Sequence, residues 1–187
     1  MGEFRDFEFL VSQLVKMRLN LEKLALSQQL FEPYGDIISK GMENKKFMIN
    51  QDYCERFDEV ASVKLLDIKS RPIISIFSAT PRKRPIKIDY LEMHPLASQA
   101  FMPIQKIDWL VVVAIDNDGS PDLSSITCFK IPGDVGISYN PKTWHFPLLV
   151  DETQDFWVID RSSSLDEKKE NLREYCFTNN EQIFYID

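Results

Sequence analysis

Sequence motifs of the common nucleotide-binding and hydrolase sites are missing from this chain. It contains no G-x-G-x-x-G run, no Walker loop and no G-x-S-x-G nucleophile elbow. Histidine is scarce as well, because the 187 residues include only two, His94 and His145. Any chemistry that needs an imidazole must use one of these two, and no serine lies in a recognisable nucleophile context.

The chain also lacks the marks of a secreted, membrane or nucleic-acid-binding protein. Its cysteines, Cys54, Cys128 and Cys176, are far apart and form no C-x-x-C pair, which is typical of reduced thiols in an intracellular protein. No apolar run approaches the ~20 residues that cross a bilayer. The 29 acidic residues outnumber the 22 basic ones, and no Lys/Arg stripe is present. Nucleic acid and membrane are therefore not expected partners, and a cytoplasmic location is expected.

The pattern that is present is that of a mainly β protein. Hydrophobic residues make up 44% and aromatic residues 12% of the chain, as in a globular domain. Short apolar or alternating segments are separated by Pro, Gly, Asn and Asp turns, which favours an antiparallel barrel or jelly roll over a βαβ fold. The expected strands include 73–77, 86–90, 99–104, 109–114, 126–131, 148–150, 155–160 and 183–186.

Two helices are expected beside these strands. Residues 5–26 show apolar positions at helical spacing, which predicts one amphipathic helix that packs on its own domain or contacts a partner. A short helix is expected near 164–172, where charged helix formers follow one another. We therefore divide the chain into a helical N-terminal extension, 1–30, and a β domain, 31–187.

The residues around His94 form a candidate site. Glu92, His94 and Gln99 follow the E-x-H-x(4)-Q spacing of a cupin-like first motif, and His145 comes later as in a second motif. Residues i and i+2 of a strand point to the same face, so Glu92 and His94 are expected to share one interior. The spacing permits a metal site, and it permits a metal-free acid/base pocket equally well.

Ordered blocks of the chain are similar to one known family. The most specific block is the run from Glu92 to Pro103, which resembles E-R-H-P-L-[GA]-[ST]-Q-A-F-[IM]-P. Further blocks are 31–38, 49–50, 55–57, 74–76, 111–114, 121–123, 136–139, 144–148 and 155–161. With them, the sequence from Phe31 to Phe177 resembles the ureidoglycolate lyase family, formerly described as ureidoglycolate hydrolases.

Some positions depart from the family pattern. Met93 replaces a common Arg, and Ser138 replaces a common Asn. Phe146 stands where bacterial members usually carry a second His after the Trp-His pair, and Tyr175 replaces a frequent His. The Glu, His, Gln and Trp-His set is intact, so the candidate site is kept.

The resemblance implies a fold, an assembly and an activity. It implies a cupin-like antiparallel β-barrel, generally a homodimer. The implied reaction is a carbon–nitrogen lyase step of allantoin and purine catabolism that splits (S)-ureidoglycolate into glyoxylate and urea for nitrogen recovery. The family association with a divalent metal, including nickel, extends to this chain as a weaker expectation.

The implied roles fall on ten residues. His94, His145, Glu92 and Gln99 are expected to be catalytic, and the same four are the candidate metal ligands. The residues expected to bind the substrate are Arg84, Arg56, Arg161, Ser98, Tyr139 and Trp144. The three arginines are candidates for the substrate carboxylate, and Trp144 is either a pocket wall or a core aromatic.

Two other functions are kept beside this one. The first is a different cupin-type enzyme that acts on another small polar acid. The second is a non-catalytic cupin-like binding module, for which the N-terminal helix would be the interaction surface.

Overall fold

The computed structural model describes residues 19–41, 45–162, 170–178 and 183–187, and these are mostly β-strand. The described helices are short: α2 spans Gln28–Phe31 and the 3-10 helix η1 spans Leu123–Ser125. The predicted mainly β, largely antiparallel class with few short helices is therefore confirmed. Within the described residues, no helix is long and apolar enough to cross a membrane.

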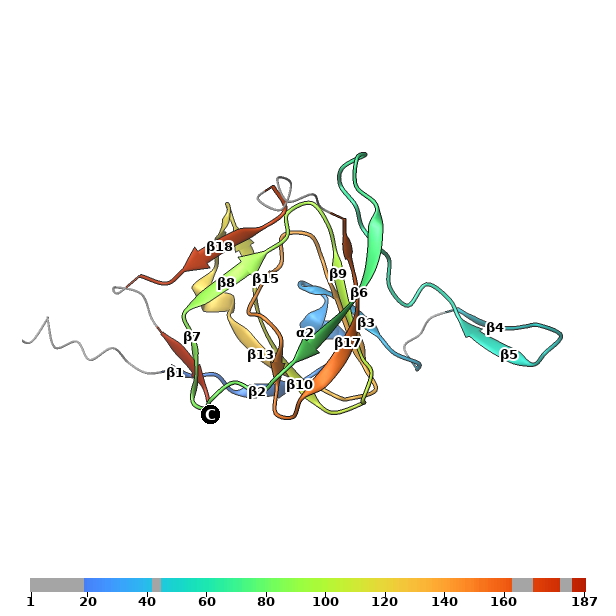
Figure 1. Cartoon of the computed structure of the whole chain (residues 1–187), viewed down its shortest axis with the longest axis horizontal. Helices are drawn as coiled ribbons and strands as arrows, with labels where there is room; N and C mark the ends of the chain where they lie inside the picture. Colours follow the sequence, from blue (N-terminus) through green and yellow to red (C-terminus); the bar gives the residue numbers. More distant parts are fainter. Residues whose placement is uncertain (1–18, 42–44, 163–169, 179–182) are drawn as a thin grey trace, which may run out of the picture.

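The largest sheet lies in the middle of the molecule (Figure 1). Its strand order is β18-β8-β15-β10-β13-β2, and β16 also pairs with β10. All six residues of β10 are buried, because other layers cover both of its faces, as its continuous apolar run predicts. The strands of this sheet are β2 Lys23–Ala25, β8 Tyr90–Met93, β10 Trp109–Ala114, β13 Thr127–Ile131, β15 Trp144–His145, β16 Leu149–Val150 and β18 Arg173–Cys176.

A second sheet packs on one face of the central sheet. Its order is β3-β14-β9-β17-β6, and all of its pairs are antiparallel. An aromatic core fills the space between the two sheets, with Trp109 of β10 and Phe156 of β17 in edge-to-face contact at 4.9 Å between ring centroids. The strands are β3 Gly35–Ile38, β6 Pro72–Ala79, β9 Gln99–Pro103, β14 Gly136–Tyr139 and β17 Gln154–Arg161.

A three-stranded sheet packs on the opposite face of the central sheet. Its order is β1-β19-β7, formed by Leu19–Asn20, Phe184–Ile186 and Ile86–Ile88. Buried Ile88 and Ile186 join Leu110 and Val112 of β10 in a second apolar cluster. The body thus has three layers, and alternate side chains of β10 enter two different cores.

Two hairpins lie outside these layers. The first, β11 Asp116–Asn117 and β12 Ser120–Pro121, turns at Asp118 and Gly119, both with positive φ, as the Asn-Asp-Gly signal predicts. The second, β4 Lys46–Ile49 and β5 Cys54–Phe57, projects from the body in Figure 1. Neither hairpin contributes to the site described below.

The predicted helix over 5–26 is wrong for its described part, because Leu19–Asn20 and Lys23–Ala25 are strands. Both pair in parallel with strands of the body, β1 with β19 and β2 with β13. Leu19 and Leu21 pack on one core, and Leu24 and Leu26 pack on the other. The apolar residues that fit a helical repeat therefore also fit the two-residue repeat of a strand. Residues 5–18 lie outside the described residues.

Two other expectations concern closure and the second helix. The pairings of the described strands form separate stacked sheets and do not close into one barrel, because the end strands of the two large sheets pair on one side only. Of the predicted helix at 164–172, residues 170–172 form a turn and a bend, and 164–169 lie outside the described residues.

Candidate active site

Glu92, His94 and His145 lie together where β8 and β15 pair. Glu92 is directly opposite His145 in the antiparallel register, and His94 follows the end of β8. One ligand atom from each of the three side chains lies within 4.8 Å of the others. The expected grouping of Glu92 and His94 with His145 from a distant strand is therefore confirmed, whereas the roles of these residues stay predictions.

The ring of His145 is fixed in one orientation. Its Nδ1 lies 3.0 Å from the carbonyl oxygen of Thr143, so Nδ1–H is the donor and the ring directs Nε2 away from that contact. That Nε2 is buried, has no hydrogen-bond partner among the described residues, and lies 3.5 Å from Glu92 Oε1. The ring of Tyr139 stacks on the imidazole at 4.4 Å between centroids. His145 is thus held rigidly and presents one unpaired nitrogen.

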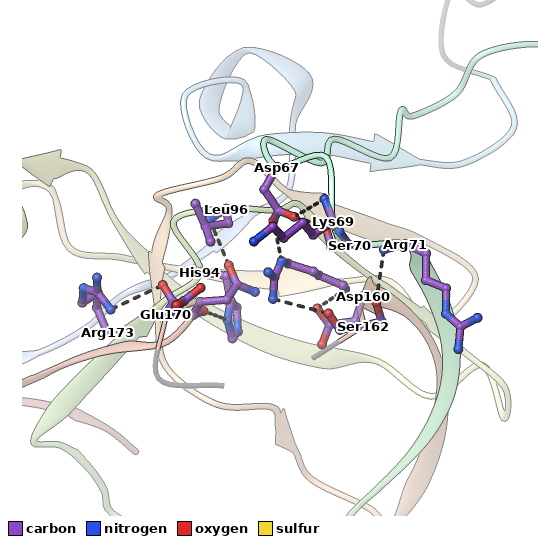
Figure 2. A network of polar contacts seen from close by, with 12 residues as sticks. Asp67, Lys69, Ser70, Arg71, His94, Leu96, Asp160, Ser162, Glu170 and Arg173 are labelled. Carbon is purple, nitrogen blue, oxygen red and sulfur yellow. Dashed lines mark hydrogen bonds and ion pairs between the residues drawn. The ribbon is translucent and has the colours of Figure 1, made fainter. Parts of the chain in front are cut away.

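His94 is held in the same tautomer by a different segment. Its Nδ1 lies 2.8 Å from the carbonyl oxygen of Asn171, which makes Nδ1–H the donor. The side chain of Asn171 is buried and accepts a hydrogen bond from the Leu96 amide at 2.9 Å, as Figure 2 shows around the labelled His94 and Leu96. Asn171 therefore ties the turn before β18 to the His94–Leu96 segment and fixes the direction of the imidazole.

Burial and neighbouring charges set the protonation of this group. Burial and the charge of His145 lower the pKa of His94 below its usual 6.5, so His94 is neutral at pH 7. Burial by itself raises the pKa of the Glu92 carboxyl, but the adjacent His145 and the charges of His94 and Arg82 outweigh it. The pKa of Glu92 consequently lies below its usual 4.5, and Glu92 is ionised at pH 7.

A cavity of about 550 Å³ opens beside Glu92 and His145. Polar and charged groups, among them Glu92, Gln99, Tyr139 and His145, meet aromatic and aliphatic side chains in its wall, an arrangement typical of small-molecule sites. Its described lining residues are Phe77, Ser78, Ala79, Thr80, Pro81, Arg82, Glu92, Gln99, Phe101, Tyr139, His145, Phe146, Pro147 and Leu148.

Gln99 lines the cavity and is held by a polar network. Its Nε2 donates to Asp160 Oδ2 at 3.0 Å, and Asp160 Oδ1 accepts from the Arg161 amide. The Arg161 side chain in turn donates to Asp67 Oδ2 at 2.7 Å, an ion pair that lowers the pKa of Asp67 to about 2. Figure 2 shows this network from Asp67 to Asp160 next to His94. The amide of Gln99 is thereby oriented by the loop that contains Asp67.

The structure places the six residues expected to bind the substrate at different positions, and only one of them lines the cavity among its described residues. Tyr139 lines the cavity, but the other five are not among its described lining residues. Ser98 is buried, and its hydroxyl accepts from the Lys64 amide. Trp144 points to the opposite face of β15 from His145 and packs in the second core, with its Nε1 donating to Asp116.

The three arginines expected to bind a carboxylate are all engaged elsewhere. Arg161 pairs with Asp67, and Arg84 pairs with Asp151 near the C-terminal residue. Arg56 lies on the projecting hairpin and pairs with Asp58. The cavity instead contains Arg82, which sequence reasoning missed because nothing in the local pattern distinguishes it from the exposed Lys83 and Arg84.

The donor set fits a divalent cation. Two imidazoles whose Nδ1 atoms contact backbone carbonyl oxygens leave their Nε2 atoms for another ligand, an ionised carboxylate lies beside them, and the buried His145 Nε2 has no hydrogen-bond partner among the described residues. Neutral His and carboxylate are ligands that Zn²⁺, Ni²⁺ and Fe²⁺ accept. Gln99, the fourth expected ligand, lies in the cavity wall with its amide nitrogen bonded to Asp160.

Comparisons with known proteins show which family this chain is similar to. A family model described as ureidoglycolate lyase matches residues 18–184. A ureidoglycolate lyase from Salmonella gallinarum is 39% identical over 163 residues, which cover 86% of this chain and 100% of that protein. A ureidoglycolate lyase from Escherichia coli O9:H4 is 38% identical over 162 residues, covering 85% of this chain and 99% of that protein. One from Shigella flexneri shows the same values, 38%, 85% and 99%.

Proposed function

The chain belongs to the ureidoglycolate lyase family, and on this premise we propose that it splits (S)-ureidoglycolate into glyoxylate and urea in allantoin and purine catabolism. One carbon of this substrate carries a hydroxyl, a carboxylate and a ureido nitrogen. The C–N bond breaks while the hydroxyl becomes the aldehyde of glyoxylate. One proton moves from the hydroxyl oxygen to the departing nitrogen, and no water is consumed.

The observation that carries this proposal is the close pair of Glu92 and His145 at the cavity. Glu92 is ionised, and its Oε1 lies 3.5 Å from His145 Nε2, so a proton can pass between the carboxylate and the imidazole. Because the reaction needs only one proton to travel from oxygen to nitrogen, this pair can accept it and return it. Such acid/base assistance typically contributes ~10²–10⁴ in rate.

Other residues of the site have supporting roles in this proposal. The amide of Gln99, oriented through Asp160, suits the urea end of the substrate, with its oxygen accepting from an NH₂ group. Tyr139 holds the His145 ring by stacking, and burial raises the pKa of its hydroxyl, which therefore stays a neutral donor. His94 completes the group beside Glu92.

As an alternative use of the same lone pairs, we propose that Glu92, His94 and His145 hold a divalent cation, for which the family resemblance suggests nickel. When bound, such a cation would act as a Lewis acid that stabilises negative charge on a substrate oxygen. The support is the fit of the three donors and the unpaired His145 nitrogen among the described residues.

The cupin-like architecture and the cytoplasmic location stay proposals as well. The two large sheets facing each other across an aromatic core support the former. The division at residue 30 also stays a prediction, although β1 and β2, which precede it, pair with strands that follow it.

The decisive experiment measures products from racemic ureidoglycolate incubated with the purified protein. We expect glyoxylate and urea in equal amounts, no ammonia, and a reaction that stops at half conversion because only one enantiomer is used. Heat-denatured protein is the control for spontaneous decay. Release of ammonia would indicate amide hydrolysis instead, and no acceleration over the control would favour the binding-module interpretation.

A homodimer is the assembly we propose, through the outer face of β6 and β17. Ile74 and Ile76 of β6 are 72% and 55% exposed, and Trp157 of β17 is 47% exposed beside Ile76. β6 also lies at the end of its sheet, so one of its edges has no neighbouring strand among the described residues. An exposed apolar row on an edge strand is a surface that natural proteins usually cover.

This dimer is tested by sedimentation velocity at micromolar protein. We expect the wild-type chain to sediment as a dimer and Ile76→Lys as a monomer. An unpaired charge buried in the interface costs ~3–5 kcal/mol. Ile115→Lys, which changes an exposed isoleucine after β10, is the matched control and should stay dimeric. A monomeric wild type, or a dimeric Ile76→Lys, would contradict this interface.

A further inference from the structure

The cavity has a positively charged residue at its margin that the sequence alone does not single out. Arg82 lies in the segment between β6 and β7. Among the described residues that line the cavity, it is the one with a cationic Lys or Arg side chain. The substrate of the proposed reaction carries a carboxylate, which needs a cation or several N–H donors to bind. Arg82 is in the position to supply them.

The guanidinium of Arg82 is held in place by the residue after His145. Its central carbon lies 4.8 Å from the centroid of the buried Phe146 ring. A guanidinium above an aromatic face gains cation–π attraction and loses part of its rotational freedom, while the N–H groups at its rim stay available. Phe146, which stands where the family resemblance leads us to expect a second His, therefore acts as a platform for Arg82.

The charge of Arg82 is also not neutralised by an ion pair within the described residues. Arg56, Arg84 and Arg161 each form an ion pair with an aspartate, whereas the described residues provide no such carboxylate partner for Arg82. Its charge nevertheless reaches the site, since it is among the influences that lower the pKa of Glu92. The positive charge of Arg82 would partly offset the repulsion that the ionised Glu92 exerts on a substrate carboxylate.

We propose that Arg82 binds the carboxylate of the substrate and makes the cavity selective for small 2-oxo and 2-hydroxy acid anions. This inference rests on the proposed function for the identity of the substrate. With the carboxylate at Arg82, which lines the same cavity as Glu92 and His145, the hydroxyl carbon extends toward that pair. Binding and chemistry are thereby assigned to different strands and loops of one cavity.

The test compares Arg82→Gln and Arg82→Lys with Lys83→Gln, which removes an equal charge from the next residue. Two quantities are measured for each protein: the kinetic constants for ureidoglycolate, and the Kd for oxamate by calorimetry. Oxamate carries a carboxylate and an amide, and its binding can be measured without turnover. Because a charge-assisted hydrogen bond is lost, we expect Arg82→Gln to raise both KM and the oxamate Kd at least about 10-fold, with a smaller change in kcat.

The controls separate carboxylate binding from other effects. Arg82→Lys should recover part of the loss, and Lys83→Gln should stay within about 2-fold of wild type, as a surface charge does. A lower kcat in Arg82→Gln with unchanged KM and oxamate Kd would overturn the inference, because Arg82 would then act through Glu92. A wild type that does not bind oxamate would overturn it too. Oxamate binding that requires Arg82 in a protein without lyase activity would support the anion site and contradict the proposed function alone.

Discussion

Replacing His145 by alanine is expected to lower kcat/KM for ureidoglycolate at least about 100-fold, and His94→Ala is expected to do the same. His145 presents its unpaired Nε2 to Glu92, and His94 completes the same group of three ligand atoms. The chain has no third histidine that could substitute for either. Urea and glyoxylate release from purified variants, with circular dichroism to verify folding, measures the effect.

The neighbour of His145 provides a matched control. Trp144 precedes it on β15 but faces the second core, so Trp144→Phe tests what a change in the same strand does to stability. Loss of its hydrogen bond to Asp116 is expected to cost about 1 kcal/mol of the free energy of unfolding and to leave kcat near the wild-type value. A large loss of kcat in Trp144→Phe would instead indicate that Trp144 acts in the pocket. Wild-type activity in both histidine variants would exclude the proposed site.

Replacing Glu92 by glutamine is the second change with a large expected effect. The amide keeps the size of the side chain but removes the negative charge, and with it both a proton acceptor and a hard ligand. We expect kcat/KM to fall at least about 100-fold and the divalent metal recovered with the purified protein to decrease. Product release and elemental analysis of the same preparations measure the two effects.

The control for Glu92 lies directly across the strand pair. Glu174 of β18 is opposite Glu92 in register but exposed, so Glu174→Gln removes the same charge outside the cavity. It should retain activity and metal content. Chelation then separates the two proposals: full activity of wild type without bound metal would remove the metal and leave the acid/base pair. Wild-type activity in Glu92→Gln would exclude both roles of this carboxylate.

The prediction succeeded best where one local pattern determines both burial and direction. Residues 109–114 are among the expected strands, and their continuous apolar run is typical of a strand that is covered on both faces, as β10 is. Likewise, spacing placed Glu92 and His94 on one side, and the scarcity of histidine left His145 as their partner. These inferences need only the geometry of one strand or the count of one residue type.

It failed where several structures satisfy the same pattern. Leucines between 19 and 26 fit a helical wheel, but with β1 and β2 paired in parallel to β19 and β13 they pack, partly buried, against the two cores. Trp144 was left as either a pocket wall or a core aromatic, and it packs in the second core because adjacent residues of a strand point to opposite faces. The arginines could not be ranked, because each is positioned by a loop or a partner aspartate that is distant in the chain.

The sequence by itself determined that this protein is mainly β, that it resembles ureidoglycolate lyases, and that Glu92, His94 and His145 are its candidate site. Strand alternation and residue identity are local properties, so they can be read without knowing how the chain folds. Only the tertiary structure decided which groups complete the site. Asn171, Thr143 and Asp160 orient His94, His145 and Gln99, and Arg82 reaches the cavity over Phe146. Apart from the local contact between Thr143 and His145, those contacts join segments that are distant in the chain, and such pairings depend on how the layers pack against one another.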